Sequence, residues 1–176
     1  MTDKASQTPL VGIIMGSDTD LPVMYEAAKT LEKFGISHEI EVISAHRSPA
    51  RAHEYASSAA KRGLKAVIVG AGGAAHLAGV VAAVTILPVI GVPMATTALN
   101  GLDSLLAIVQ MPGGIPVATM AIDKAGAVNA AILAAQIIGT SDPKVAKRLE
   151  QHKQELAESV QQKNSRLPQK IAELVK

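Results

Sequence analysis

Short apolar runs alternate with longer helix-compatible stretches along most of this chain, and this alternation limits its fold more than any other feature. The apolar runs have the length of strands and comprise Val11–Met15, Glu39–Ser44, Ala66–Gly70, Pro88–Val92 and Ile115–Ile122. The helical stretches after them comprise Leu21–Phe34, Pro49–Arg62, Ala74–Val84, Gly101–Val109 and Ala125–Ile138. Because repeated strand–helix units give parallel strands with right-handed crossovers, the alternation predicts an α/β fold, a three-layer αβα sandwich around a parallel sheet.

One domain accounts for most of the chain. Five strands favour a flavodoxin-like order over a barrel, and we assign the catalytic domain to residues 11–140. Residues 1–10 are polar, carry no apolar segment typical of a signal peptide, and are expected to form a flexible lead-in. Residues 141–176 are predicted to form a helical extension, which begins at a capping Asp142 and a first-turn Pro143.

The extension carries one narrow apolar stripe. Its members recur at spacings of three and four residues and are Val145, Leu149, His152, Leu156 and Val160. The long helix is expected to end at Leu167-Pro168, and residues 171–175 could form one more docking turn. Since a stripe of this kind must lie on an apolar surface, we expect the helix to pack against protein.

The middle of the chain is nearly free of charge. The sequence contains 17 Lys and Arg and 15 Asp and Glu residues. Between Ala66 and Ser141 the only charged ones are Asp103, Asp123 and Lys124. The uncharged window from Leu77 to Thr96 has the length of a membrane span, but Pro88 and Pro93 divide it into strand-sized runs, which argues against a membrane protein. Because the helices here are Ala-rich and nearly uncharged, we infer an extensive interface between subunits.

The composition argues against several classes of protein and of site. The net charge of +2 comes from scattered Lys and Arg, which argues against a protein that binds nucleic acid. The absence of cysteine excludes disulfides and thiolate metal sites and suits a cytoplasmic protein. The histidines show no ligand spacing, so we expect no metal.

Polar residues follow the first strand, in the segment Met15-Gly-Ser-Asp-Thr-Asp-Leu-Pro22. Ligands of open parallel sheets bind beyond the carboxyl ends of the strands. Free backbone N–H groups and hydroxyls at a helix start suit a phosphate. The alternative is structural, with Asp20 capping the helix and Ser17 filling a turn.

The second strand ends in Ser44-Ala-His-Arg-Ser-Pro49, which places a proton carrier beside a fixed cation. His46 can exchange a proton near neutral pH, and Arg47 can hold a phosphate or carboxylate in its planar fork. A solvated loop histidine beside a surface arginine is the plainer explanation of this segment by itself.

The third strand ends in Gly70-Ala-Gly-Gly-Ala-Ala-His-Leu77, whose glycines allow a backbone to approach a ligand closely. The segment also fits a loose dinucleotide fingerprint, but no Asp or Glu lies about 20 residues downstream to receive a ribose. His76 is either a second polar contact or a residue of the helix start.

Taken together, these three segments and Gln110-Met-Pro-Gly-Gly-Ile-Pro-Val-Ala-Thr119 closely resemble the PurE family of purine biosynthesis, from about Val11 to Leu149. Ala74-Ala75-His76-Leu77 resembles class I, the N5-carboxyaminoimidazole ribonucleotide mutases. The resemblance implies transfer of a carboxylate from the exocyclic nitrogen of an imidazole ribonucleotide to ring carbon 4, without ATP, biotin, metal or other cofactor.

The resemblance also implies roles for individual residues. His46 matches the general acid/base of the family. Ser17, Ser44 and Arg47 match its phosphate- and ribose-anchoring positions, and Asp20 matches the carboxylate that contacts the sugar hydroxyls. The loop over the base and carboxylate is matched by Gly72, Gly73 and His76.

The family forms homo-octamers, with active sites near subunit junctions and the C-terminal helix packed on neighbouring subunits. Two positions depart from the family pattern: Ala78 stands where proline is usual, and Gly113 occupies a variable position. A carboxylase that uses aminoimidazole ribonucleotide and carbon dioxide is the nearer alternative function. A non-catalytic domain that binds nucleotides is the more distant one.

Overall fold

A computed structural model describes residues 8–175, and its centre is a five-stranded parallel sheet. The strand order is β2-β1-β3-β4-β5, which confirms the predicted flavodoxin-like α/β fold. The strands are β1 (Val11–Met15), β2 (His38–Val42), β3 (Ala66–Gly72), β4 (Val89–Met94) and β5 (Ala118–Thr119). Residues 1–7 of the expected lead-in lie outside the described residues, and Leu10 already donates a backbone hydrogen bond to Ser37.

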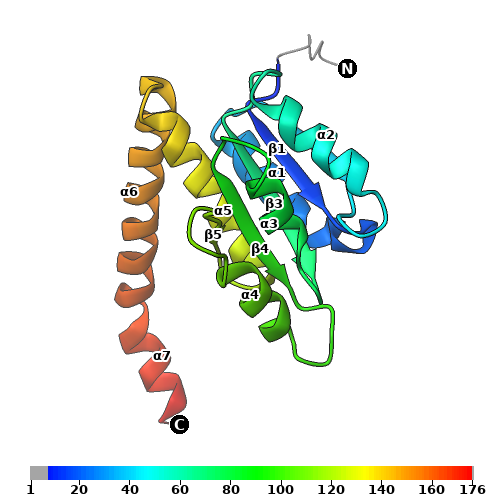
Figure 1. Cartoon of the computed structure of the whole chain (residues 1–176). Helices are drawn as coiled ribbons and strands as arrows, with labels where there is room; N and C mark the ends of the chain where they lie inside the picture. Colours follow the sequence, from blue (N-terminus) through cyan, green and yellow to red (C-terminus); the bar gives the residue numbers. More distant parts are fainter. Residues whose placement is uncertain (1–7, 176) are drawn as a thin grey trace, which may run out of the picture.

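Helices cover both faces of the sheet and complete the predicted three layers (Figure 1). One face carries α1 (Leu21–Lys33) and α5 (Asp123–Gly139). The other carries α2 (Pro49–Ala59), α3 (Leu77–Ala82) and α4 (Leu102–Val109). Successive strand residues point to opposite faces, so Ile13 packs in the first layer and Ile14 in the second.

The fifth strand is much shorter than expected. We predicted a strand over Ile115–Ile122, but β5 spans only Ala118–Thr119 and pairs with Ile90 and Gly91 of β4. Pro116 has no N–H for a ladder, and the segment lies at the edge of the sheet, so only one partner strand can order it.

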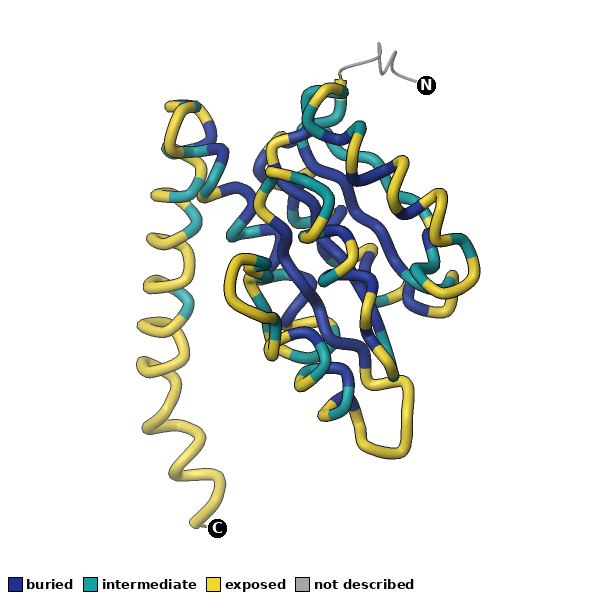
Figure 2. The backbone as a smooth tube through the Cα atoms, in the orientation of Figure 1, coloured by how far each residue is buried: buried dark blue, intermediate teal, exposed yellow. Residues whose placement is uncertain are grey.

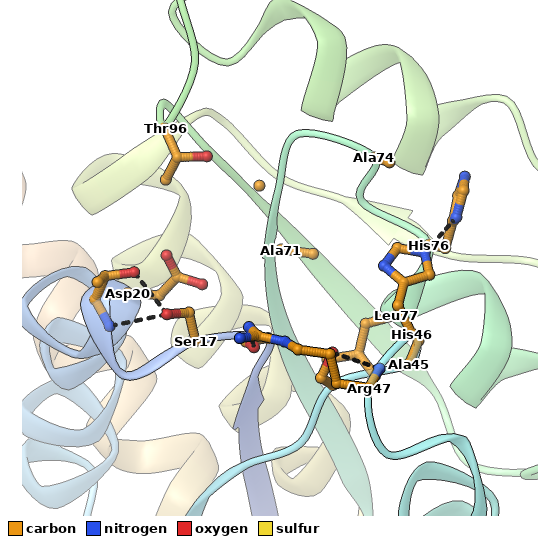
Figure 3. A pocket seen from close by; sticks show the side chains of 14 residues that line it. Ser17, Asp20, Ala45, His46, Arg47, Ala71, Ala74, His76, Leu77 and Thr96 are labelled. Carbon is orange, nitrogen blue, oxygen red and sulfur yellow. Dashed lines mark hydrogen bonds between the residues drawn. The ribbon is translucent and has the colours of Figure 1, made fainter.

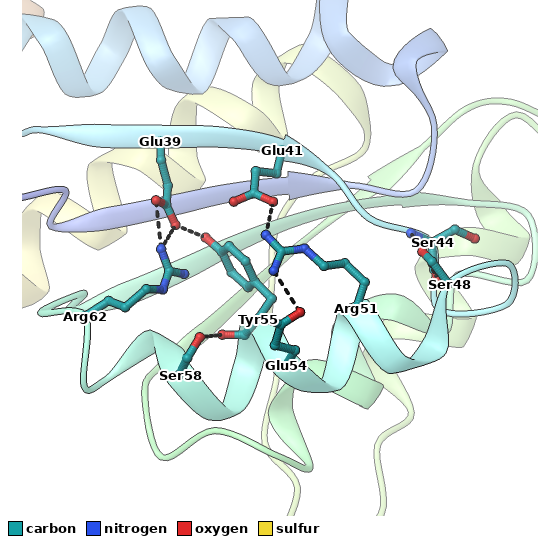
Figure 4. Close-up of polar contacts among 9 residues, drawn as sticks. All are labelled: Glu39, Glu41, Ser44, Ser48, Arg51, Glu54, Tyr55, Ser58 and Arg62. Carbon is teal, nitrogen blue, oxygen red and sulfur yellow. Dashed lines mark hydrogen bonds and ion pairs between the residues drawn. The ribbon is translucent and has the colours of Figure 1, made fainter.

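The opposite edge of the sheet carries a polar network that joins β2 to α2 (Figure 4). The hydroxyl of Tyr55, a fully buried residue, donates to Glu39 Oε1 at 2.7 Å. Arg62 Nη1 donates to both oxygens of Glu39, at 2.6 and 2.8 Å. Arg51 bridges Glu41 and Glu54 nearby. These contacts hold the edge strand in place just before the chain enters the segment that begins at Ser44.

The C-terminal extension consists of α6 (Pro143–Ser165) and α7 (Leu167–Leu174). As predicted, Asp142 caps α6, because its carboxylate accepts from the N–H groups of Lys144 and Val145. Val145 is buried against the sandwich, but Leu156 and Val160 are 50% and 64% exposed. Figures 1 and 2 show the later turns of α6 and α7 standing away from the rest of the molecule. The second half of the stripe is therefore at least half exposed in the single chain.

The strand order also positions the candidate site. From β1 the sheet grows to β2 on one side and to β3 on the other, so the chain changes direction between β1 and β3. Crevices at the carboxyl ends of strands beside such a switch point are the usual ligand sites of open α/β sheets. Within residues 8–175, no helix combines the length and the apolar character that crossing a membrane requires.

Candidate active site

A pocket of about 210 Å³ opens at the carboxyl ends of β1 and β3. Seven of the eight predicted site residues line it: Ser17, Asp20, Ser44, His46, Arg47, Gly72 and His76. Gly73 is not among the lining residues, although its φ of +60° turns the chain directly after Gly72. In Figure 3, Ser17 and Asp20 lie on one side of the pocket and His46 and His76 on the other, with Arg47 between them.

The segment after β1 forms a tight polar turn. Ser17 caps a short 3-10 helix, η1 (Asp18–Asp20), and its Oγ accepts hydrogen bonds from the backbone and the hydroxyl of Thr19 at 3.3 and 2.8 Å. The structural alternative for Asp20 is wrong in one respect, because this residue occupies the N-cap position of α1 but its side chain makes no hydrogen bond that caps the helix. The turn therefore offers hydroxyl groups to the pocket.

Asp20 is a buried carboxylate, only 4% exposed. Burial raises its pKa above the ordinary 3.8, and the negative charges of Asp123 and Asp18 raise it further. A hydrogen bond from the backbone of Ser17 acts in the opposite direction. No salt bridge among the described residues involves Asp20.

The segment after β2 is held by reciprocal serine contacts. Ser48 Oγ donates to the carbonyl of Ser44 at 3.0 Å and accepts from the N–H of Ser44 at 3.1 Å. Ser44 Oγ accepts from the N–H of Arg47 at 3.2 Å. The guanidinium of Arg47 donates to the carbonyl of Gly16 at 3.3 Å and so joins the first two segments. No carboxylate of the described residues pairs with Arg47, which leaves its positive charge available to an anion.

The second and third segments meet through their histidines. Nε2 of His46 lies 2.8 Å from Nδ1 of His76, with the rings nearly perpendicular at 82°. One of these nitrogens must carry the shared proton, so the two imidazoles form a hydrogen-bonded pair. His76 immediately precedes α3, which begins at Leu77 rather than at the predicted Ala74 because two tight turns occupy residues 73–76.

Thr96 is a lining residue that we did not predict. It follows β4, and a Cβ on Gly72 would overlap its hydroxyl, so the two residues are in close contact. Ligands bind beyond the carboxyl ends of parallel strands, and this holds for the fourth strand as for the first three. The two threonines after Met94 therefore indicated a further polar contribution to the site. The other unpredicted lining residues are Gly16, Thr19, Ala45, Ala71, Ala74 and Leu77.

The arrangement combines three kinds of chemistry. A guanidinium and several hydroxyls can anchor a phosphate, a carboxylate can accept hydrogen bonds from hydroxyl groups, and an imidazole pair can supply and remove protons. Among the described residues, no group of three or more His, Asp or Glu side chains could hold a metal ion. The pocket thus suits a small phosphorylated molecule whose reaction involves proton transfer.

Comparison with known proteins gives concordant matches. Residues 10–159 match the family described as AIR carboxylase. The chain is 59% identical over 162 residues to N5-carboxyaminoimidazole ribonucleotide mutase of Pyrococcus horikoshii, covering 92% of this chain and 90% of that protein. The Bacillus subtilis protein of the same name is 53% identical over 159 residues, with coverage of 90% and 98%. The crystal structure of Treponema denticola PurE matches with a TM-score of 0.81 at 28% identity, over 90% of this chain and 98% of that one.

Proposed function

The chain belongs to the AIR carboxylase family, and on this premise we propose that it is an N5-carboxyaminoimidazole ribonucleotide mutase of purine biosynthesis. The observation that carries this assignment is one pocket with a proton-exchanging pair, His46 and His76, facing Asp20 and Ser17 across Arg47. Relatives that match most of the chain are named for the same reaction, which supports the substrate.

We assign the binding end of the pocket to the ribose phosphate. Arg47 and the hydroxyls of Ser17 and Ser44 anchor the phosphate, because a guanidinium without a carboxylate partner favours an anion. Asp20 accepts hydrogen bonds from the ribose hydroxyls, which gives a partner to an otherwise costly buried charge. The imidazole ring of the substrate then points toward His46.

His46 acts as general acid and then as general base. It gives its proton to the exocyclic nitrogen as the N–CO₂⁻ bond breaks, which leaves carbon dioxide and aminoimidazole ribonucleotide. Carbon 4 attacks the trapped carbon dioxide, and His46 removes the proton from carbon 4 to restore the aromatic ring. The proton count is unchanged over the cycle, so the reaction is an isomerisation. The loop with Gly72, Gly73 and His76 closes over the base and keeps carbon dioxide next to carbon 4.

The contact of His46 with His76 has a consequence for substrate binding. Nε2 of His46 is engaged by Nδ1 of His76 at 2.8 Å, so a substrate that reaches Nε2 must replace this hydrogen bond. His76 then holds the catalytic imidazole in the absence of substrate and releases it when the base enters.

Replacement of His46 tests the assignment. His46→Asn should lower turnover of the N5-carboxylated substrate by a factor on the order of 10² to 10⁴, while the ribonucleotide still binds. His53→Asn is the matched control, because His53 is exposed on α2 and lies outside the pocket. Unchanged turnover in His46→Asn would reject the role of this residue. Arg47→Ala should instead raise KM, and an unaltered KM would count against phosphate anchoring.

Direct carboxylation is the second candidate, since the family description is AIR carboxylase. The two candidates differ in their substrates. A mutase converts the N5-carboxylated compound far faster than aminoimidazole ribonucleotide with bicarbonate, and a carboxylase shows the reverse preference. Assay of purified protein with each substrate separately decides between them.

We also propose that the protein works in the cytoplasm as a homo-octamer, as the family resemblance implies. The support is the exposed second half of the α6 stripe, where Leu156 and Val160 face solvent in the single chain. An apolar helix face of this kind gains stability by packing on a neighbouring subunit. Sedimentation should detect the octamer and show partial dissociation when both residues are changed to Glu. A stable wild-type monomer would refute the proposal.

A further inference from the structure

Asp123 is one of the three charged residues of the charge-poor middle region, and its backbone conformation is unusual. It is the first residue of α5 and has a φ of +57°, in the left-handed region that residues other than glycine rarely adopt. Asn100 is the other non-glycine residue with a positive φ among those described. A side-chain contact that is possible only in this conformation would explain why Asp123 adopts a positive φ.

The carboxylate of Asp123 makes such a contact. Its Oδ1 accepts a hydrogen bond at 2.9 Å from the backbone N–H of Ala95, the first residue after β4. The start of α5 cannot easily shift, because a Cβ on Gly126 would overlap the carbonyl of Ala121 and the helix therefore packs directly on this preceding segment. Asp123 thus ties the exit of β4 to a fixed point at the start of α5.

The residue next to Ala95 belongs to the pocket. Thr96 lines the cavity and contacts Gly72 of the third segment. A displacement of Ala95 would therefore move Thr96 and open space beside Gly72. The hydrogen bond from Asp123 fixes one wall of the pocket from outside it.

Asp123 also acts on the pocket through its charge. Burial is the largest cause of the raised pKa of Asp20, and Asp123 and Asp18 are the charged groups that raise it further. Asp18 lies on the same short helix as Asp20, whereas Asp123 belongs to α5. The positive charge of the neighbouring Lys124 contributes to the lowered pKa of Glu26 and is not among the causes for Asp20.

We propose that Asp123 is a positioning residue of the pocket, which holds the exit of β4, and with it Thr96, through its hydrogen bond with the N–H of Ala95. The proposal rests on the proposed function, in which this pocket binds the ribonucleotide. Loss of the Asp123 charge makes Asp20 ionise at lower pH, and loss of the acceptor oxygen releases Thr96.

Two substitutions separate these effects. Asp123→Asn keeps an acceptor oxygen and removes the charge, so the acidic limb of the kcat/KM profile should move to lower pH. Asp123→Gly suits the positive φ but also removes the acceptor, so it should show the same pH shift and roughly a tenfold increase in KM. The matched control is Asp103→Asn, because Asp103 holds the same loop through the hydroxyl of Thr97 but is not among the charges acting on Asp20. An unaltered KM in Asp123→Gly, or an equal increase of KM in Asp123→Asn, would overturn the proposal.

A second measurement requires no enzymatic activity. Thermal unfolding compares Asp123→Gly with Asp123→Asn, which differ in the acceptor oxygen. Asp123→Gly should lower the melting temperature more than Asp123→Asn does, because it leaves the N–H of Ala95 without its acceptor. Equal melting temperatures would overturn the role of this hydrogen bond even if the chain proved inactive as a mutase, so the two failures are distinguishable.

Discussion

Gly12→Ala should severely destabilise the protein, because the space beside Gly12 is occupied by the buried tyrosine of α2. A Cβ at this position of β1 would overlap the hydroxyl of Tyr55 and lie 2.8 Å from Cδ2 of Leu64. Tyr55 cannot move aside without cost, since its hydroxyl donates to Glu39 at 2.7 Å. Burial and the Glu39 carboxylate raise the pKa of Tyr55, so the hydroxyl remains a donor at all physiological pH values.

The expected loss of stability has three components. Overpacking a well-filled core costs about 1–3 kcal/mol. Displacing Tyr55 breaks a hydrogen bond to a charged acceptor, which is worth about 1.5–3 kcal/mol. The lower entropy of the unfolded chain with alanine returns about 0.4–1 kcal/mol. Gly12→Ala should therefore lower the free energy of unfolding by about 2–5 kcal/mol, with its main cause in the hydroxyl of Tyr55.

Urea unfolding of a mutant cycle tests this cause. Tyr55→Phe by itself loses the hydrogen bond to Glu39, but in the Gly12→Ala background it also removes the closest clash. The double variant should be more stable than the sum of the single effects predicts, by about 1–2 kcal/mol. All variants are compared at one protein concentration, because the stability of an oligomer depends on it. A loss below about 1 kcal/mol for Gly12→Ala, or an additive cycle, would refute this account of the packing.

Three further substitutions have defined outcomes. Asp20→Asn should raise the melting temperature at pH 7. The pKa of Asp20 is raised in the folded state, so its carboxylate destabilises the fold at pH values above its ordinary pKa of 3.8. A gain in melting temperature that persists well below pH 3.8 would contradict burial as the cause. Gly72→Ala should raise KM roughly tenfold, because the added methyl group pushes Thr96 aside. The double variant Gly72→Ala/Thr96→Ala should have a KM close to that of the wild type. A KM that stays high in the double variant would show that the contact with Thr96 is not the cause. Asp142→Ala should cost about 1 kcal/mol in urea unfolding through loss of the α6 cap, and Asp142→Asn much less; equal losses would exclude the cap.

The sequence was sufficient to predict the sheet and most of the pocket because both depend on local patterns. Apolar runs of strand length define β1 to β4, and the geometry of parallel sheets brings their carboxyl ends to one edge. Polar residues that are far apart in the chain could therefore be assigned to one site without knowledge of their contacts. The second segment, which resembled a solvated loop by itself, lines the pocket through Ser44, His46 and Arg47.

The features that could not be predicted depend on contacts between distant segments. The pairing of His46 with His76 joins residues 30 positions apart, and neither position shows a local pattern that fixes the distance. Asp123 resembles an ordinary residue at the start of a helix, and its hydrogen bond to Ala95 spans 28 positions. The shortness of β5 depends on its position at the edge of the sheet, which periodicity does not reveal.

The pocket contains a cation and a buried carboxylate that do not pair with each other, an arrangement that a ligand would explain. Arg47 and Asp20 line the same cavity, yet no salt bridge of the described residues joins them. A buried carboxylate without an ion partner is unfavourable, and pairing it with Arg47 would stabilise the protein but neutralise the cation. Arg47 donates instead to the carbonyl of Gly16. A ligand with an anionic group for Arg47 and hydroxyls for Asp20 satisfies both at once. Under the proposed function, binding of the ribose phosphate would recover the cost of keeping them apart.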